Sequence, residues 1–316
     1  MNKPIVSIVI LTRDRYNLLK KCISSIKDST YKDFEVILID NGSIDNTKYI
    51  TKEFQELNIR YFFTKIKKLS RLRQYGIEQA KGRYVIMIDD DCVLDPKYIE
   101  LVVKRFEEDE NIAIIGGNLI NIGFDKGSLN KGKGKIGINC KYETVTKINL
   151  AEVFGSACMS IRKEVFEEVG GYDLYCDFME EVDLTLKVKN RGYKICFEPN
   201  AIIKHYKSEI YYRPLFNSPN KIRLYLFFKY FTPKTIKEWF SFFYNEFYLL
   251  GYDIKNFFLT FPFIGTIKKN LFEYSFLYSF LKIFNIYINV IIKFYLIFLD
   301  RIIIPFLYIK SKKSRI

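Results

Sequence analysis

Three consecutive carboxylates, Asp89, Asp90 and Asp91, directly follow the apolar run Tyr84–Ile88. Adjacent like charges repel and are costly to hold at close range. A bound divalent cation removes that cost, and carboxylate oxygens suit Mg²⁺ or Mn²⁺, which commonly bridge protein carboxylates to substrate phosphates. The cluster therefore predicts a metal site, in preference to a solvated turn that merely tolerates three charges.

Two further features carry possible chemistry elsewhere in the chain. Glu180 and Glu181 precede Val182 and Asp183, and a carboxylate beside a metal-bound diphosphate can act as general base toward an acceptor hydroxyl. Acidic residues also favour the start of a helix, which is the simpler explanation of this group by itself. His205 is the single histidine; neutral imidazole is a common metal ligand, although a lone histidine is more often structural.

Alternating apolar runs and helical patterns predict an open α/β sheet with helices on both faces. In such sheets ligands bind beyond the carboxyl ends of the strands. The turn that begins at Asp40 and the Asp89–Asp91 cluster both follow predicted strands, so we expect them on one edge of the sheet. The predicted strands are 5–11, 34–39, 60–63, 84–88 and 112–116, and the predicted helices are 16–26, 46–57, 71–80 and 95–107.

The formal charge of +14 is concentrated at one end of the 316-residue chain. Residues 211–316 hold 16 Lys and Arg against 5 Asp and Glu, together with 32 of the 54 aromatic residues. Basic and aromatic composition is typical of segments that bind anionic membrane surfaces or nucleic acid. The most apolar stretch, Ile283–Leu299, is marginal for a spanning helix, so we expect amphipathic helices that lie on a membrane.

Cysteine usage and the first residues bear on the compartment. The six cysteines show no close spacing, and several lie in apolar runs, where cysteine behaves as a small hydrophobe. This pattern indicates a reducing compartment without a disulfide framework or a zinc site. The run Ile5–Leu11 is too short for a signal peptide and predicts a strand.

Gly123–Tyr142 is rich in Gly and Lys, which indicates a mobile loop or a plain solvated connector.

Several weak motifs follow one another in a specific order over roughly residues 4–206. They are Val6–Thr12, Leu19–Ile26, Asp40–Thr47, Arg73–Ile77, Ala80–Gly82, Asp89–Asp91, Gly155–Ile161, Gly170–Asp173, Glu180–Leu184, Gly192–Tyr193 and Ala201–His205. Together they resemble glycosyltransferase family 2, whose members have the GT-A fold and invert the anomeric centre. Asp89–Asp91 is similar to the Asp-x-Asp motif of that family, and Asp40–Thr47 to its base-recognition turn.

The resemblance implies roles for individual residues. Asp40 is expected to accept a hydrogen bond from uracil or thymine N3–H. Glu181 stands at the usual base position, with Glu180 beside it. The expected metal ligands for Mn²⁺ or Mg²⁺ are Asp91, Asp89 and His205. The expected contacts to the nucleotide-sugar are Thr12, Asp14, Asp40, Gly42, Ser43, Arg73, Asp89 and Asp90.

The chain departs from the family pattern at three points. Glu180-Glu181 stands where Glu-Asp is usual, so which carboxylate reaches the acceptor stays open, and Gln74 stands where Asn is common. The Gln-x-x-Arg-Trp pattern of processive synthases is absent, which favours transfer of one sugar per event.

The sequence thus predicts an α/β protein with a Rossmann-like open mixed sheet of the GT-A type at 1–210. A mainly helical, membrane-associating extension is expected at 211–316. The expected function is metal-dependent transfer of one sugar from a UDP- or dTDP-sugar to a glycan or lipid-linked acceptor hydroxyl, in cell-surface glycan or polysaccharide assembly. The expected location is cytoplasmic, on the inner face of the cell membrane.

Three other functions were weighed against this one. A nucleotidyltransferase should carry a Gly- and Lys/Arg-rich phosphate loop after its first strand, and Thr12–Arg15 is not such a loop. A non-catalytic nucleotide-sugar binder or scaffold subunit of a membrane glycan assembly complex is supported only by the Glu-Glu departure. No nucleic-acid partner is expected, because the basic tail contains no recognised binding motif.

Overall fold

The computed structural model describes residues 3–123, 133–136, 142–144, 151–177, 179–206, 219–231, 233–235 and 237–246. The chain divides into two compact units, residues 1–232 and residues 233–316. Part of the extension expected at 211–316, helix α7 (Pro219–Phe231), belongs to the first unit. In the second unit residues 237–246 are helical, and the stretch Ile283–Leu299 lies outside the described residues.

The first unit is built on an eight-stranded mixed sheet with the strand order β3-β2-β1-β4-β10-β6-β11-β5. The strands β3, β2, β1 and β4 run parallel, β11 runs parallel to β6, and β10 and β5 run antiparallel to their neighbours. The strands are β1 (Val6–Thr12), β2 (Phe34–Asp40), β3 (Ile59–Phe63), β4 (Tyr84–Asp89), β5 (Cys92–Leu94), β6 (Ile112–Ile122), β10 (Met159–Arg162) and β11 (Lys194–Tyr206).

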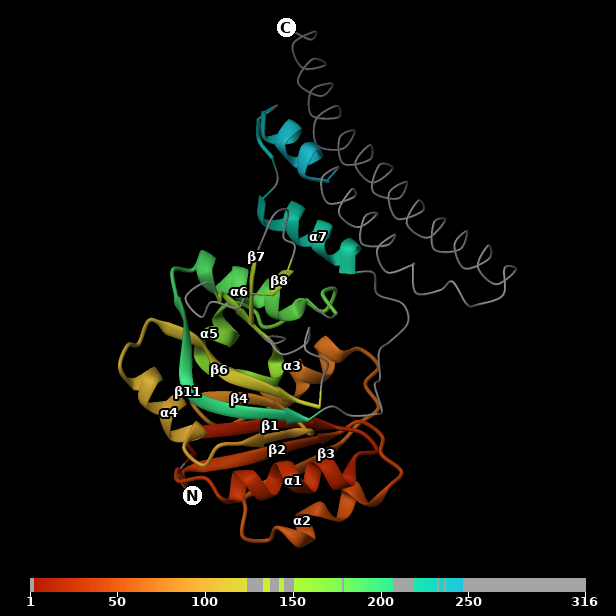
Figure 1. Cartoon of the computed structure of the whole chain (residues 1–316). Helices are drawn as coiled ribbons and strands as arrows, with labels where there is room; N and C mark the ends of the chain where they lie inside the picture. Colours follow the sequence, from red (N-terminus) through yellow and green to blue (C-terminus); the bar gives the residue numbers. More distant parts are fainter. Residues whose placement is uncertain are drawn as a thin grey trace, which may run out of the picture. The chain divides into compact units, whose positions relative to one another are not determined.

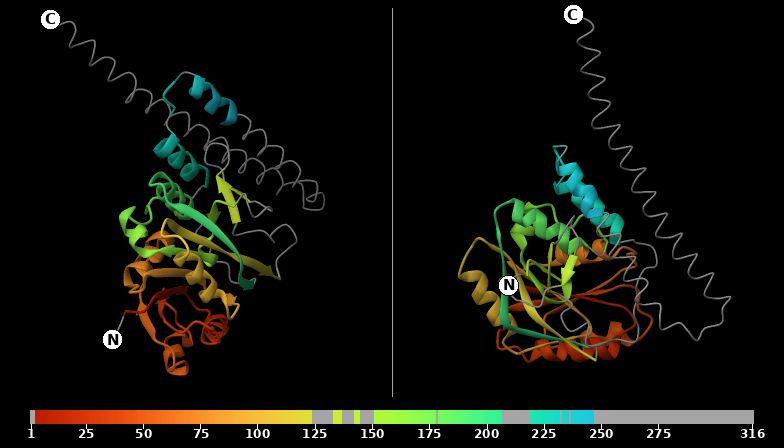
Figure 2. Two further views of the ribbon diagram at one scale, coloured as in Figure 1. Left: turned by 90° about the vertical axis from the view of Figure 1, so that its left-hand side faces the viewer. Right: turned by 45° about the horizontal axis from the view of Figure 1, so that its top comes forward.

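Helices cover both faces of this sheet, as the sequence predicts. Helices α1 and α2 lie on one face and α3, α5 and α6 on the other (Figure 1), and the same separation is visible from the directions in Figure 2. Nearly every residue of β1, β2 and β4 is buried, because helices cover them on both sides. The helices are α1 (Tyr16–Lys27), α2 (Ile50–Glu53), α3 (Leu69–Gln79), α4 (Tyr98–Glu107), α5 (Lys163–Glu168) and α6 (Glu180–Asn190).

A second, antiparallel sheet has the strand order β8-β7-β9. Its strands are β7 (Lys133–Ile136), β8 (Tyr142–Thr144) and β9 (Val153–Phe154). Phe154 packs directly on Gly116 of β6, where a Cβ would lie 2.0 Å from the phenylalanine ring. The glycine therefore lets β9 approach the main sheet.

Two local predictions were partly wrong. The helix expected at 46–57 is instead a 3₁₀ turn (Asn46–Tyr49) followed by the single turn of α2, because the buried Phe54 leaves the helical conformation at φ −120° and ψ 53°. The loop expected over Gly123–Tyr142 contains β7 and the first residue of β8, because its glycine-rich segment pairs with neighbouring strands. Residues 124–132 and 137–141 of that loop lie outside the described residues.

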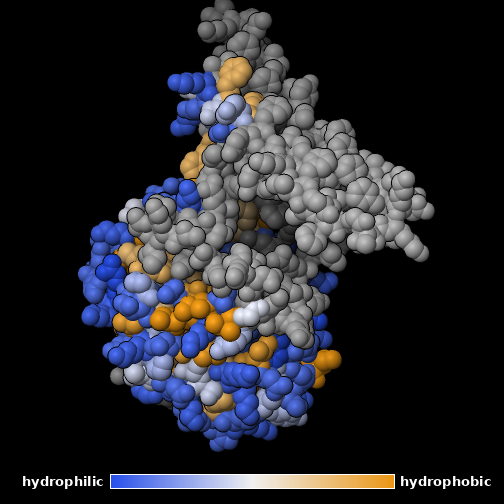
Figure 3. Space-filling model, in the orientation of Figure 1, coloured by the Kyte–Doolittle hydropathy of each residue, from blue (hydrophilic) through white to orange (hydrophobic). Residues whose placement is uncertain are grey.

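Surface polarity is uneven on the face seen in Figure 1. Hydrophilic residues dominate the lower part, and apolar side chains gather over β6 (Figure 3), where Ile120 and Ile122 are exposed. Within the described parts of the chain, no helix is both long enough and apolar enough to cross a bilayer.

Candidate active site

The carboxyl ends of β1, β2 and β4 bring the predicted site residues to one edge of the sheet. Thr12 pairs with Asp40 across β1 and β2, and Leu11 pairs with Asp89 across β1 and β4. Parallel strands in register end together, so residues 28 and 78 positions apart in sequence come level. The prediction that the Asp40 turn and the aspartate cluster share an edge is confirmed.

The aspartates contact the loop that follows β1. The hydroxyl of Thr12 donates to Asp90 Oδ2 at 2.7 Å. One nitrogen of Arg15, Nη1, is 2.8 Å from Asp90 Oδ1 and 3.1 Å from Asp91 Oδ2. Asp90 and Asp91 are both buried, so this guanidinium offsets the repulsion between two carboxylates held away from water.

Strand pairing places His205 beside the aspartates. His205 lies in β11 opposite Asn121 of β6 and opposite Cys92 of β5, the residue directly after Asp91. Its Nε2 is 3.2 Å from Asp91 Oδ1, and its Nδ1 is 2.8 Å from Asn121 Oδ1. An Nδ1–H that donates to Asn121 leaves Nε2 facing the carboxylate, which is the tautomer that a metal-binding imidazole needs.

The pKa values of Asp89, Asp90 and His205 are shifted upward, and a bound cation would stabilise the charged carboxylates. Burial raises the pKa of Asp89, and the Asp91 charge raises it further. Burial also raises the pKa of Asp90 to about 6, although Arg15 opposes the shift. Burial lowers the pKa of His205, but the hydrogen bond and charge of Asp91 outweigh it, and the net shift is upward. Asp91, Cys92 and His205 each offer a ligand atom, and these atoms lie within 4.8 Å of one another. A carboxylate, a thiol and an imidazole fit a borderline divalent ion.

The turn after β2 is held by its own aspartate. Asp40 is buried, and its Oδ1 accepts from Ser43 N at 2.8 Å while its Oδ2 accepts from the Tyr61 hydroxyl at 2.6 Å. Gly42 has φ 87°, a left-handed conformation that glycine adopts without steric cost. The carboxylate expected to read a base is therefore fixed in place from two sides.

Ser43 also links this turn to the loop after β1. Its hydroxyl accepts from Asp14 N at 2.9 Å, and Asp14 Oδ1 accepts from Ile44 N at 2.8 Å. Asp14 has φ 53°, an uncommon conformation for a residue other than glycine, which these bonds maintain. The structure thus brings Asp14, Asp40, Gly42 and Ser43 together, as expected of one binding turn.

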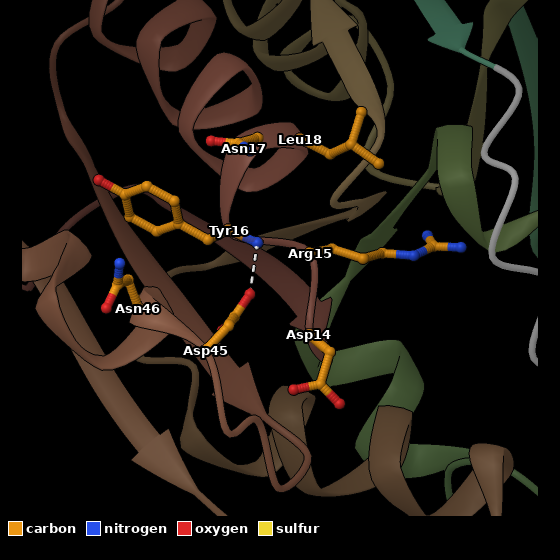
Figure 4. Close-up of a pocket in the computed structure, with 7 residues that line it drawn as sticks. All are labelled: Asp14, Arg15, Tyr16, Asn17, Leu18, Asp45 and Asn46. Carbon is orange, nitrogen blue, oxygen red and sulfur yellow. Dashed lines mark hydrogen bonds between the residues drawn. The ribbon is translucent and has the colours of Figure 1, made fainter.

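A cavity of about 440 Å³ opens beside the two loops (Figure 4). Tyr16 N donates to Asp45 Oδ2 at 3.0 Å along its wall. In Figure 4 the Arg15 side chain points away from Asp45, and its guanidinium contacts Asp90. The lining residues are Asp14, Arg15, Tyr16, Asn17, Leu18, Asp45 and Asn46.

Arg73 joins the second acidic group to the first. Its Nη1 hydrogen-bonds Glu180 Oε1 and lies 3.4 Å from Glu181 Oε1. The charge of Asp89 also acts on Arg73. Arg73, which is expected to contact the nucleotide-sugar, therefore contacts Glu180 and Glu181, the two candidate general bases.

The two glutamates at the start of α6 differ in exposure. The Glu180 side chain is fully buried, whereas that of Glu181 is 15% exposed. Burial raises the pKa of Glu180 to about 7, with the Glu181 charge adding to the shift and Arg73 opposing it. The Ser156 hydroxyl and backbone N both donate to Glu181 Oε1, so its other oxygen is the one available to a substrate.

Sequence reasoning did not select five residues that contact this site. Arg15 could have been found from the sequence, because it lies in the loop after β1, at the same edge of the sheet as the aspartates. The others come from other parts of the fold; Ser156 lies in the motif Gly155–Ile161, and no local motif marks the remaining three. The four others are Tyr61, Asn121, Ser156 and Lys229, the last through Asp183.

Comparison with known families assigns the chain. Residues 7–170 match Glycosyl transferase family 2. The chain belongs to glycosyltransferase family 2. Membership places it among the transferases, and the resemblance read from the motifs is confirmed. The matched segment contains the aspartate cluster, the Asp40 turn and Arg73, whereas Glu180, Glu181 and His205 lie beyond it.

One curated relative is "Glycosyltransferase AglE" of Haloferax volcanii, 26% identical over 208 residues, which are 64% of this chain and 67% of the relative. The chain spans much less of other curated relatives, for example 15% and 25% of two of them.

Two solved structures show the same fold at low sequence identity. GalNAc-T7 with UDP, GalNAc and Mn²⁺ is 18% identical with a TM-score of 0.57, over 72% of this chain and 48% of that one. The mannosyltransferase PcManGT from Pyrobaculum calidifontis, with GDP-Man and Mn²⁺, is 15% identical with a TM-score of 0.50, over 65% of this chain and 57% of that one. The predicted GT-A architecture is thereby confirmed for the mixed sheet.

Proposed function

We propose that this protein transfers one sugar from a nucleotide-diphospho-sugar to an acceptor hydroxyl, with inversion at the anomeric carbon and with Mn²⁺ or Mg²⁺ as cofactor. The observation that carries the proposal is that Thr12, Asp40 and the aspartate cluster lie at one edge of the sheet. His205 lies beside Asp91 and adds an imidazole to the possible metal ligands there. Both solved neighbours described above contain Mn²⁺ and a nucleotide, which supports the same class of donor here.

Asp91, Asp89 and His205 are the residues proposed to hold the metal. A divalent cation bound there supplies positive charge to the departing diphosphate. Arg15 adds a second positive group, because its guanidinium already reaches Asp90 and Asp91. Asp40 is proposed to recognise the base, with Thr12, Asp14, Gly42, Ser43 and Asp90 lining the nucleotide site.

Glu181 is the proposed general base, because it is the less buried of the two glutamates and keeps one oxygen outside its contacts with Arg73 and Ser156. Glu181 takes the acceptor proton as the acceptor oxygen forms a bond to the anomeric carbon. The bond between that carbon and the diphosphate oxygen breaks, and its electron pair leaves with the nucleotide diphosphate. Attack from the opposite face inverts the configuration.

The acceptor and the membrane context are proposed from the other end of the chain. The basic and aromatic composition of residues 211–316 supports a lipid-linked or cell-surface glycan acceptor on the cytoplasmic face of an anionic membrane. A form ending at residue 232 keeps α7 and should lose sedimentation with phosphatidylglycerol vesicles; unchanged sedimentation contradicts membrane binding by the tail.

Calorimetric titration with UDP, with and without Mn²⁺, is the first test of the active site. We expect UDP binding that depends on Mn²⁺ and that Asp91→Asn abolishes, while Glu110→Gln, an exposed control, leaves it intact. UDP-GlcNAc and GDP-Man are then assayed for turnover. Affinity that is unchanged in Asp91→Asn contradicts the metal assignment.

The alternative is a non-catalytic nucleotide-sugar-binding or scaffold subunit. Metal-dependent binding of UDP or GDP without release of sugar to any acceptor or to water favours that alternative. If the protein binds none of UDP, GDP and dTDP, both functions are contradicted.

A further inference from the structure

A lysine joins helix α7 to helix α6. Lys229 Nζ is 2.7 Å from Asp173 Oδ2 and 2.7 Å from Asp183 Oδ1. The hydroxyl of Tyr225 donates to Asp173 Oδ2 at 2.7 Å, and that of Tyr230 donates to Asp183 Oδ1 at 2.6 Å. Asp183 is fully buried. Lys187 of α6 lies 3.1 Å from its Oδ2, whereas the donors to its Oδ1, Lys229 and Tyr230, come from α7. Loss of Lys229 leaves this buried carboxylate less well compensated, which is unfavourable.

Apolar side chains close the same interface. Helix α7 contributes Ile222 and Leu226 to a buried cluster, and α6 contributes Val182 and Leu186. Cys176 belongs to this cluster and is fully buried. α7 lies beside α6 in Figure 1. The thiol of Cys176 is therefore buried in the cluster that this interface closes.

The two carboxylates that bind Lys229 lie close in the chain to the elements that carry the glutamates and Arg73. Asp183 lies in the first turn of α6, the turn that carries the two glutamates. Asp173 lies in the segment that continues to Asp177, whose Oδ1 accepts from Ser70 N at 3.0 Å at the start of α3. Helix α3 carries Arg73, which holds the glutamates. Movement of α7 would therefore reach the glutamates and the arginine together.

A metal ion is the other cation that this cluster could accommodate. The carboxylates of Asp173 and Asp183 and the thiol of Cys176 lie close enough to one another to bind one. However, the ammonium of Lys229 already lies between the two carboxylates. Burial lowers the pKa of Lys229, but the bonds to Asp173 and Asp183 outweigh it and raise the pKa, so the side chain stays charged. The chain supplies its own cation at this position.

We infer that Lys229 is a positioning residue that fixes α7 on α6 and thereby holds Glu180 and Glu181 in place for proton transfer. This role rests on the proposed function, because it concerns the alignment of the proposed base. A carboxylate that acts on an acceptor hydroxyl must stay within hydrogen-bond reach of it, and small displacements cost large factors in rate. Helix α7 is thus coupled to the proposed general base through the ammonium group of Lys229.

Chemical modification of Cys176 tests the docking of α7 without any donor or acceptor. We expect Lys229→Met to raise the rate of modification by N-ethylmaleimide at least about tenfold, because opening of the interface becomes more frequent. Peptide mass spectrometry follows Cys176 and, as an internal reference, the buried Cys22. Lys229→Arg keeps the cation and should react at the wild-type rate, as should Lys21→Met, which removes an exposed lysine of α1.

Each outcome of this experiment decides the point. A wild-type rate at Cys176 in Lys229→Met overturns the inference, because α7 then stays docked without the ammonium. An equal increase at Cys22 also overturns it, because the effect is then general unfolding. Neither result depends on whether the protein turns over a nucleotide-sugar.

The catalytic consequence is measured once turnover of a donor is found. We expect kcat of Lys229→Met to fall by about 10- to 100-fold, with Mn²⁺-dependent affinity for UDP within about twofold of wild type. Lys229→Arg should recover most of kcat. Selective opening at Cys176 with an unchanged kcat would show that α7 docks through Lys229 but does not position the base.

Discussion

Replacement of Glu180 by glutamine gives the sharpest prediction about the protonation chemistry of the site. Glu180 is fully buried, and burial with the Glu181 charge raises its pKa from 4.5 to about 7. The folded state therefore favours the protonated side chain, and the stability that Glu180 contributes is present below pH 4.5 and lost as the pH rises through about 7. At about 1.4 kcal/mol per pKa unit, the loss is on the order of 3 kcal/mol.

Glu180→Gln removes the ionisation but keeps the shape and an oxygen that can accept from Arg73. We expect its free energy of unfolding to exceed that of the wild type by about 3 kcal/mol at pH 8, but by less than about 1 kcal/mol at pH 5. Urea unfolding followed by circular dichroism in EDTA measures both values. Glu110→Gln is the matched control, because Glu110 is exposed. A difference between Glu180→Gln and wild type that is equal at the two pH values refutes the reasoning.

Three further predictions concern the base, the nucleotide turn and the packing of the second sheet. Glu181→Gln should lower kcat at least about 100-fold with unchanged UDP affinity; steady-state kinetics retaining more than a tenth of kcat would rule this residue out as the base. Tyr61→Phe removes the 2.6 Å hydrogen bond to buried Asp40 and should reduce the free energy of unfolding by about 1–3 kcal/mol, which urea titration at pH 7 tests; an unchanged midpoint contradicts it. Gly116→Ala places a Cβ 2.0 Å from the Phe154 ring and should cost at least about 1–3 kcal/mol; a thermal midpoint equal to that of the wild type would show that β9 moves freely.

The sequence by itself determined the central strands and the edge where the chemistry lies. Mainly apolar runs such as Ile5–Leu11, in which Ser7 is the one polar residue, are expected where both faces of a strand are covered, which indicates a central position in a parallel sheet. Asp40 and Asp89 follow two such runs, so their common edge follows from the direction of the strands. This information is local, because it depends on neighbouring residues along the chain.

Local patterns misled where tertiary contacts override them. The pattern at 46–57 is typical of one helix, yet Phe54 turns into the core and ends α2 after one turn. The glycine-rich segment after Gly123 reads as a loop, yet Lys133–Ile136 pairs with strands on both sides. In both segments the conformation depends on burial or strand pairing in the packed fold, which propensity alone does not identify.

The partners of the reactive groups were decided by the tertiary structure alone. His205 contacts Asp91 because β11 lies between β6 and β5 in the sheet. These three strands are not consecutive in the sequence. Exposure separates Glu181 from Glu180, although the two are adjacent and chemically identical. Burial and the approach of distant charges set protonation and reach, and both are properties of the packed fold that no run of neighbouring residues contains.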